Sequence, residues 1–154
     1  DKAVDEVIAF RKQEGEMLGN VLREKIENIR NLLDKIGPYE AERIEKVKLR
    51  LYEGLKSLEG IEYDKNRFEQ ELIYYIEKLD ISEEKERLAN HLNYFIETLE
   101  NEQSQGRKLG FIAQEIGREI NTMGAKSNHS EMQRLVVQMK DELEQIKEQV
   151  LNVL

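Results

Sequence analysis

Apolar residues recur at every third or fourth position along almost the whole chain, which is the spacing of one face of an α-helix. No stretch alternates apolar and polar residues in the way that indicates a half-buried strand. The pattern therefore predicts an all-α fold. The first seam predicts a helix over about residues 2–36 and uses Val4, Ile8, Leu18, Leu22, Ile26, Ile29, Leu33 and Ile36.

The N-terminal part of this seam is interrupted between Ile8 and Leu18. Continuing the same spacing through the gap puts Arg11 and Gly15 on the apolar face. Two explanations are open: an exposed helix end beyond the core, or a charged contact to a missing domain or ligand. We expect Arg11 to lie at a contact with another domain or subunit. Because the chain starts at Asp1 in a helical pattern without a Met, we interpret it as part of a longer protein.

Gly37-Pro38 predicts the end of the first helix, since glycine commonly follows a last helical turn and proline begins the next element. A second helix follows to about Ser57. The two would form a long antiparallel hairpin over residues 1–60, and residues 61–154 would form a second helical domain. The apolar face of the second helix comprises Ile44, Val47, Leu51, Leu55 and Leu58.

Three more helices are predicted at about residues 65–79, from a cap at Asp80 to about residue 100, and at 106–123. Two alternatives are open for Asn101 to Gln105: a loop, or a nearly continuous passage between the second and third of these helices. Residues 124–127 are a predicted loop. The buried positions predicted for these helices are Phe68, Leu72, Tyr75 or Ile76, and Leu79; then Leu88, Leu92, Phe95 and Leu99; then Leu109, Ile112, Ile116, Ile120 and Met123.

The last helix carries a seam whose spacings alternate between four and three, as in a coiled coil. Such a seam packs along another helix, in its own chain or in a partner's. Asn128 with Glu131 predicts a capping box at the start of this helix. We expect oligomerisation through apolar helix faces that include this seam, which consists of Met132, Val136, Met139, Leu143, Ile146, Val150 and Val153.

Composition excludes several classes of protein. The chain has no cysteine, so disulfides and Cys-based zinc sites are excluded, and no apolar run is long enough to span a membrane. The net charge of −8 argues against a generic nucleic-acid binder. Residues 104–127 differ from the rest, because four basic residues there face only two acidic ones. A polyanionic partner would therefore meet this segment.

The same segment holds the first candidate site. Glu115, Arg118, Glu119 and Thr122 are three or four residues apart and so share one helical strip. Two carboxylates at this spacing can hold a divalent metal, and the arginine between them can bind phosphate. The alternative is a set of surface salt bridges.

A second strip follows Asp80 in the preceding helix, with Glu84, Arg87 and His91 at the next helical positions. His91 is a candidate general acid–base or ligand, and the alternative is a plain surface or core-edge histidine. His129, the second histidine, sits in a capping position. The chain contains no phosphate loop, dinucleotide fingerprint, nucleophile elbow or zinc motif.

These strips belong to longer motifs that cover nearly the whole chain. The chain resembles the C-terminal part of the YicC/YloC family of bacterial endoribonucleases, a family of stress-induced proteins. The motifs that carry this resemblance are Arg11 with Glu14-Gly15; Asn66-Arg67-Phe68-Glu69-Gln70-Glu71; Asp80 to Glu84 with Arg87-Leu88 and His91; Gly106 to Leu109 with Phe111, Gln114-Glu115, Arg118-Glu119, Asn121-Thr122 and Lys126-Ser127; and Glu144-Gln145 to Glu148-Gln149 with Asn152.

The resemblance implies a cytoplasmic endoribonuclease that needs a divalent cation, Mn²⁺ or Mg²⁺, and assembles as a hexamer enclosing RNA. It also implies a missing N-terminal domain. Gly110 and Gly117 stand where the family is expected to have Asp and Asn, which puts any role of those two side chains in doubt. The alternative is a non-catalytic helical module for oligomerisation or RNA docking. Under the favoured hypothesis Glu115 and Glu119 hold the metal with Glu84 or Asp80, His91 joins catalysis, and Arg107, Lys108, Arg118, Asn121 and Lys126 contact RNA.

Overall fold

The computed structural model describes residues 2–56, 65–101 and 106–152, apart from the side chains at positions 11, 12, 55, 56 and 65. Within these ranges the chain forms helices joined by short connections and contains no strand, so the predicted all-α class is confirmed. The helices are α1 (Lys2–Lys56), α2 (Lys65–Leu79), α3 (Ser82–Asn101), α4 (Gly106–Lys126) and α5 (Ser130–Leu151). No described helix is long and apolar enough to cross a membrane.

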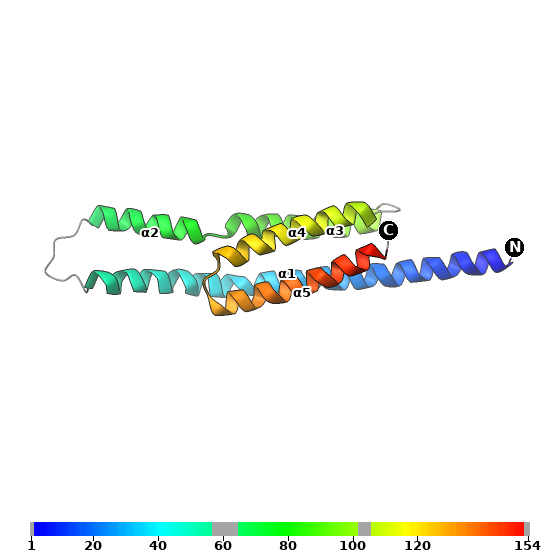
Figure 1. The fold of residues 1–154 in the computed structure, drawn as a ribbon, viewed down its shortest axis with the longest axis horizontal. Helices are drawn as coiled ribbons and strands as arrows, with labels where there is room; N and C mark the ends of the chain where they lie inside the picture. Colours follow the sequence, from blue (N-terminus) through cyan, green and yellow to red (C-terminus); the bar gives the residue numbers. More distant parts are fainter. Residues whose placement is uncertain (1, 57–64, 102–105, 153–154) are drawn as a thin grey trace.

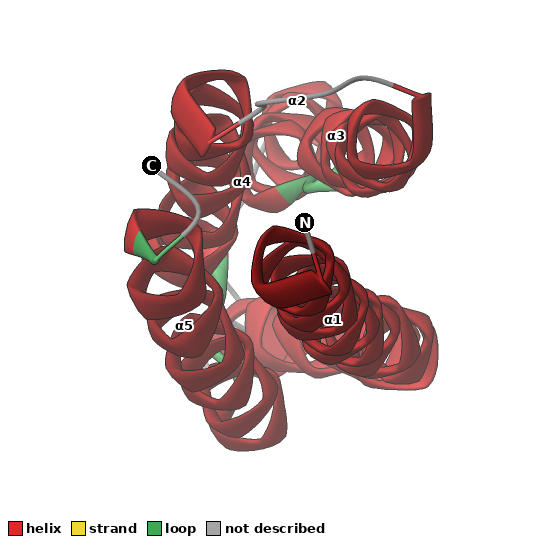
Figure 2. Cartoon of the chain, turned by 90° about the vertical axis from the view of Figure 1, so that its right-hand side faces the viewer, coloured by secondary structure: helices red, strands yellow, loops and turns green. Residues whose placement is uncertain are grey.

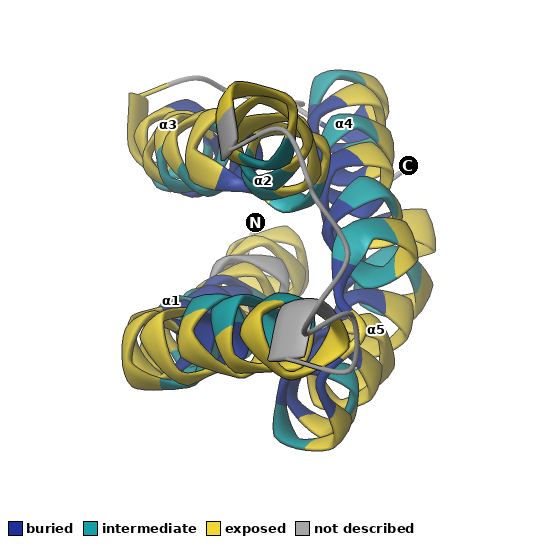
Figure 3. Ribbon diagram, turned by 90° about the vertical axis from the view of Figure 1, so that its left-hand side faces the viewer, coloured by how far each residue is buried: buried dark blue, intermediate teal, exposed yellow. Residues whose placement is uncertain are grey.

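Helix α1 runs along almost the whole length of the molecule, and α2 and α3 return beside it in succession (Figure 1). Helices α4 and α5 form an antiparallel pair over its middle. Seen along the long axis, α1, α3, α4 and α5 surround a common core, to which each turns its buried face (Figures 2 and 3). Helix α2 lies beyond this bundle against the C-terminal end of α1.

The core consists of the apolar seams that the sequence predicts. Its buried members in α1, α3 and α4 include Leu22, Ile26, Ile29, Leu33, Ile36, Leu88, Leu92, Phe95, Leu109, Ile112, Ile116, Ile120 and Met123, and those in α5 include Met132, Val136, Met139, Leu143, Ile146 and Val150. Leu99 packs against this core and is half-buried. The spacing therefore identified the inward face of four helices correctly.

The predicted helix break at Gly37-Pro38 is wrong, because α1 continues through Pro38 as a single helix of 55 residues. An internal proline removes one backbone hydrogen bond and costs about 3 kcal/mol. Here Ile36 before it and Arg43 after it are both buried against other helices, and these contacts hold the two sides in line. The helical hairpin is formed instead by the end of α1 and α2, whose connection lies outside the described residues.

Helix α2 turns its predicted face toward α1 but is buried only in part. Phe68, Leu72, Ile76 and Leu79 are half-buried, whereas Tyr75 is exposed. The ring of Phe68 lies 5.6 Å from that of Tyr52 on α1. The hairpin is therefore a thin two-helix extension of the bundle.

The other end of α1 projects beyond the bundle (Figure 1). Every described side chain of residues 2–17, here called the N-terminal arm, is exposed. Its predicted seam residues Val4 and Ile8 keep 53% and 51% of their surface in solvent. The exposed helix end that the interrupted seam suggested is thus observed. The side chain of Arg11 lies outside the described residues, and its contact with another domain or subunit stays a prediction.

The start of α5 differs from the prediction. Helix α4 extends to Lys126 instead of ending near residue 123, and the N-cap of α5 is His129 rather than Asn128. The Nδ1 atom of His129 accepts hydrogen bonds from the backbone N–H groups of Glu131, at 3.2 Å, and Met132, at 3.4 Å. A buried imidazole thus satisfies two donors at the helix start, the task expected of a short polar side chain.

The seam of α5 is buried against α1 and α4 of the same chain. Its members from Met132 to Val150 all lie in the core, and Val153 lies outside the described residues. The seam therefore already has its partner helices, and the expectation that it forms an intermolecular interface is wrong. Self-association of the chain stays a prediction, and surfaces other than this seam would have to form the interface.

Three glycines of α4 at seven-residue intervals face α5. A Cβ atom added at Gly124 would lie 3.1 Å from Val136 Cγ1, and one at Gly117 would lie 3.0 Å from Leu143 Cδ2. At Gly110 the nearest atom, Val150 Cγ1, would be 3.9 Å away. Gly124 and Gly117 therefore allow α4 and α5 to pack closely. This packing compensates for the low helix propensity of glycine, which costs about 1 kcal/mol per residue relative to Ala. Toward Gly110 the packing is looser.

Candidate active site

The two predicted strips meet where α3 packs against α4. Arg87 of α3 joins them, because its Nε lies 3.3 Å from the carboxylate of Glu119 on α4 and its Nη2 lies 3.9 Å from Glu84 Oε1. Both carboxylates are buried, with 2% of Glu84 and 7% of Glu119 exposed. The side chain of Arg87 itself is about half exposed, at 48%. Two buried acids thus share one guanidinium that also reaches solvent.

Glu84 has a second cationic partner. The Nζ of Lys126, at the end of α4, lies 2.8 Å from Glu84 Oε1 and donates to the backbone carbonyl of Asp80 at 3.2 Å. The other carboxylate oxygen, Glu84 Oε2, is buried and has no hydrogen-bond partner among the described residues. An unpartnered buried carboxylate oxygen costs free energy, so this atom is suited to accept a further ligand.

The sequence prediction missed two charged residues of α1 beside this network. Arg43 is 2% exposed and donates hydrogen bonds to the carbonyls of Leu79 and Lys126, the last residues of α2 and α4. Burial lowers the pKa of its guanidinium below the ordinary value for arginine. Glu40, also buried, pairs with Lys85 at 2.6 Å. One helix thus holds the ends of two others next to Glu84.

The remaining predicted ligands are engaged elsewhere. Glu115 forms a surface pair with Arg118 at 3.6 Å, one helical turn away. The Asp80 carboxylate accepts hydrogen bonds from Ser82 Oγ at 2.7 Å and Ser82 N at 3.2 Å, which hold its pKa below 3.8. Within the described ranges, no three acidic or histidine side chains form a cluster that could hold a metal. The structure therefore joins Glu84 with Glu119 and leaves Glu115 and Asp80 with other partners.

His91 lies one turn beyond Arg87 on α3 and is half-buried. Of the predicted RNA contacts, Arg107, Arg118 and Asn121 lie exposed on the outward face of α4. Lys108 is half-buried, and its ammonium lies 5.3 Å from the centre of the Tyr94 ring.

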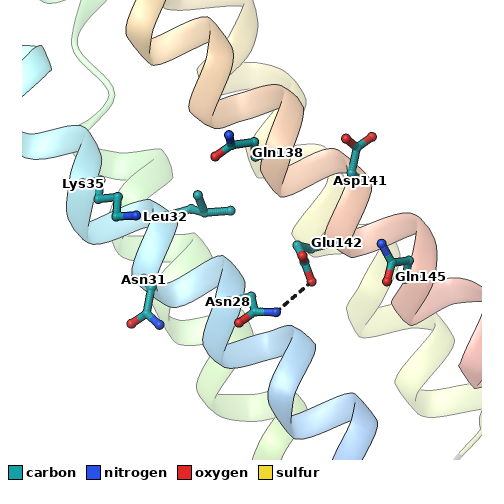
Figure 4. Close-up of a pocket in the computed structure, with 8 residues that line it drawn as sticks. All are labelled: Asn28, Asn31, Leu32, Lys35, Gln138, Asp141, Glu142 and Gln145. Atoms are coloured by element: carbon teal, nitrogen blue, oxygen red, sulfur yellow. Dashed lines mark hydrogen bonds between the residues drawn. The ribbon is translucent and has the colours of Figure 1, made fainter.

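A separate polar hollow of about 470 Å³ lies between α1 and α5 (Figure 4). Asn28 donates to Glu142 Oε2 across it at 3.2 Å, and Lys25 also pairs with Glu142. Its lining mixes amides with side chains of both charges, and none of the predicted site residues contributes to it. It therefore stands apart from the α3–α4 site.

These features define an all-helical domain with a buried acid–guanidinium network between two helices and exposed cations along one of them. The chain belongs to the family described as endoribonuclease YicC-like, C-terminal, whose pattern matches residues 36–154. This confirms the family that the sequence motifs indicated.

Two curated relatives are similar over almost the whole chain. One, from Clostridioides difficile strain 630, is 34% identical over 148 residues, which cover 94% of this chain and 50% of the relative. The other, from Haemophilus influenzae strain ATCC 51907, is 30% identical over 153 residues, which cover 99% of this chain and 53% of the relative. Both are named probable endoribonuclease YicC. The chain thus spans about half the length of the curated relatives it matches.

Proposed function

We propose that this chain forms the RNA-cleaving part of a metal-dependent endoribonuclease, with Glu84 and Glu119 as the acids that hold the cation. The observation that carries the proposal is the buried pair itself, in which Glu84 Oε2 has no hydrogen-bond partner among the described residues. Carboxylate oxygens are the donors that Mg²⁺ and Mn²⁺ prefer. The names of the two relatives support the reaction class.

When bound, the cation would supply an activated water and neutralise charge on the phosphate. The protein's own groups orient the reactants. Arg87 fixes the Glu119 carboxylate with one edge of its guanidinium and presents its exposed part to a phosphate oxygen. His91, one turn away, is of the side-chain type that most often transfers protons in catalysis. Arg118 and Asn121 hold the RNA backbone along α4.

Glu119→Gln in the full-length protein tests this proposal. Glutamine keeps the shape of the side chain and an oxygen that can accept from Arg87, but it loses the charge that a cation needs. We expect the cleavage rate of a labelled single-stranded RNA to fall at least about a hundredfold, with partial rescue at raised Mn²⁺. The melting temperature should change little.

Glu83→Gln is the matched control, because Glu83 pairs with the same Arg87 at 3.5 Å from the exposed side. It should cleave RNA at the wild-type rate. Glu115→Gln tests the original prediction for α4, and its surface pair with Arg118 leads us to expect a smaller loss than for Glu119. Wild-type rates in Glu119→Gln at every Mn²⁺ concentration would contradict the proposal.

The second candidate is a non-catalytic module for RNA docking or oligomerisation. The exposed N-terminal arm favours it, together with the half of each relative that this chain does not cover. Under this hypothesis Glu119→Gln would leave cleavage by the full-length protein intact, and substitutions in the arm would change the molecular mass in light scattering. Cleavage lost in Glu119→Gln without a change of mass would exclude it.

A further inference from the structure

An exposed phenylalanine interrupts the polar outer face of α4. At spacings of four, three, four and three this face presents Arg107, Phe111, Gln114, Arg118 and Asn121, all exposed. Phe111 is flanked on this face by Arg107 and Gln114, and it keeps 62% of its surface in solvent. The bundle therefore does not use this ring as a core residue.

Phe111 lies at the edge of a hollow of about 520 Å³ between α4 and α5. Small residues of α4, Gly106, Gly110 and Ala113, line it opposite Val150 of α5. The hollow opens where the helices pack more loosely, since a Cβ atom at Gly110 would still be 3.9 Å from Val150. The absence of a side chain at position 110 thus leaves an apolar recess beside an exposed aromatic ring.

The described charged residues that line this recess are basic, although the whole chain carries −8. Arg107 and Lys147 contribute to its lining, and none of the described residues that line it is acidic. Arg107 has no ion pair among the described residues, while Lys147 pairs with Glu144 at 3.6 Å on the surface of α5. An apolar recess with an aromatic wall and a cationic rim is complementary to a flat base attached to a phosphate.

We propose that this recess binds one unpaired base of single-stranded RNA, with Phe111 as the stacking residue. Arg107 and Lys147 bind the adjacent phosphates, and the amide of Gln114 hydrogen-bonds the edge of the base. The inference rests on the proposed function and adds a subsite to it. Phe111 precedes Glu119 by eight residues, or about 12 Å along the helix axis, so the bound base sets which phosphate reaches the acids.

The test measures the affinity of the full-length protein for a fluorescein-labelled single-stranded oligoribonucleotide without added divalent metal. Phe111→Leu keeps an apolar side chain but removes the aromatic face, and we expect binding about ten- to a hundredfold weaker. Phe111→Trp should restore it. Gly110→Leu fills the recess at a helical position with room for a side chain and should weaken binding similarly. The control is Phe10→Leu in the N-terminal arm, where the phenylalanine is also 62% exposed, and it should bind as the wild type does.

Salt dependence separates the two kinds of contact. Arg107→Gln should reduce the slope of log affinity against log salt by about one unit, whereas Phe111→Leu should leave it unchanged. Wild-type affinity in both Phe111→Leu and Gly110→Leu would overturn the proposed base-binding subsite. The proposed function would remain intact in that case if Glu119→Gln still abolishes cleavage. A changed molecular mass in Phe111→Leu, with RNA affinity unaltered, would show that the recess docks a protein and would also overturn it. Wild-type protein that neither binds nor cleaves RNA would refute the proposed function itself.

Discussion

Replacing Arg43 by methionine tests whether one side chain of α1 holds the candidate site together. The guanidinium is buried and donates to the terminal carbonyls of α2 and α4. Methionine has a similar length and fills similar space, but it cannot donate a hydrogen bond. The carbonyls of Leu79 and Lys126 would then lose their partner at the junction of three helices.

The size of the effect follows from these two bonds. A hydrogen bond from a charged donor contributes about 1.5–3 kcal/mol, so the pair contributes about 3–6 kcal/mol. Burying the guanidinium opposes this, as the lowered pKa of Arg43 indicates, and methionine carries no such cost. We therefore expect a net loss of about 2–4 kcal/mol. In a domain of this size that lowers the melting temperature by roughly 5–15 °C.

Urea unfolding followed by circular dichroism at 222 nm measures this loss. The matched control is Arg134→Met, because Arg134 is 70% exposed and only pairs with Glu131 on the surface of α5. It should change the free energy of unfolding by less than about 0.5 kcal/mol. Equal losses in the two variants would refute the argument that Arg43 holds the ends of α2 and α4.

Two further predictions concern polar groups at the helix starts. His129→Ala should cost about 1 kcal/mol in urea unfolding because the N-cap of α5 is lost, whereas His129→Asn should keep most of the stability; equal losses would show that Nδ1 is not the capping atom. Asp80→Asn should be less stable than the wild type above pH 3.8. The lowered pKa of Asp80 means that its charge stabilises the fold there, and this difference should shrink as the pH falls through the lowered value. A difference that is constant from pH 2 to 7 would contradict this assignment.

The seam of α1 shows what the sequence could and could not predict. Spacings of four and three identify Leu22, Ile26, Ile29, Leu33 and Ile36 as core residues, and all are buried. Carried past Pro38, the same spacings reach Glu40 and Arg43, which are also buried. The expectation that proline ends a helix hid this continuation. Local propensity was outweighed by contacts between helices, which no spacing within one helix reports.

The candidate site was predictable only in part for a similar reason. Helical spacing placed Glu84 with Arg87 on one strip and Glu119 on another, but the contact between the strips depends on how α3 and α4 are aligned. The capping role of His129 had a signal in its position, although a short polar side chain was the stronger expectation. Gly117 was predicted only as a departure from the family, and the structure explains it by the close approach of Leu143.

The uninterrupted course of α1 has a mechanical consequence. A helix of 55 residues is about 80 Å long, and it carries the N-terminal arm at one end and Arg43 toward the other. The N-terminal arm and Arg43, which binds the ends of α2 and α4, therefore belong to one continuous helix. Pro38 removes a backbone hydrogen bond five residues before Arg43, so α1 bends most easily at this position. A force on the N-terminal arm is transmitted along α1 to the segment at Pro38. This segment lies next to the start of α3, which carries Glu84, and the end of α4, which carries Lys126.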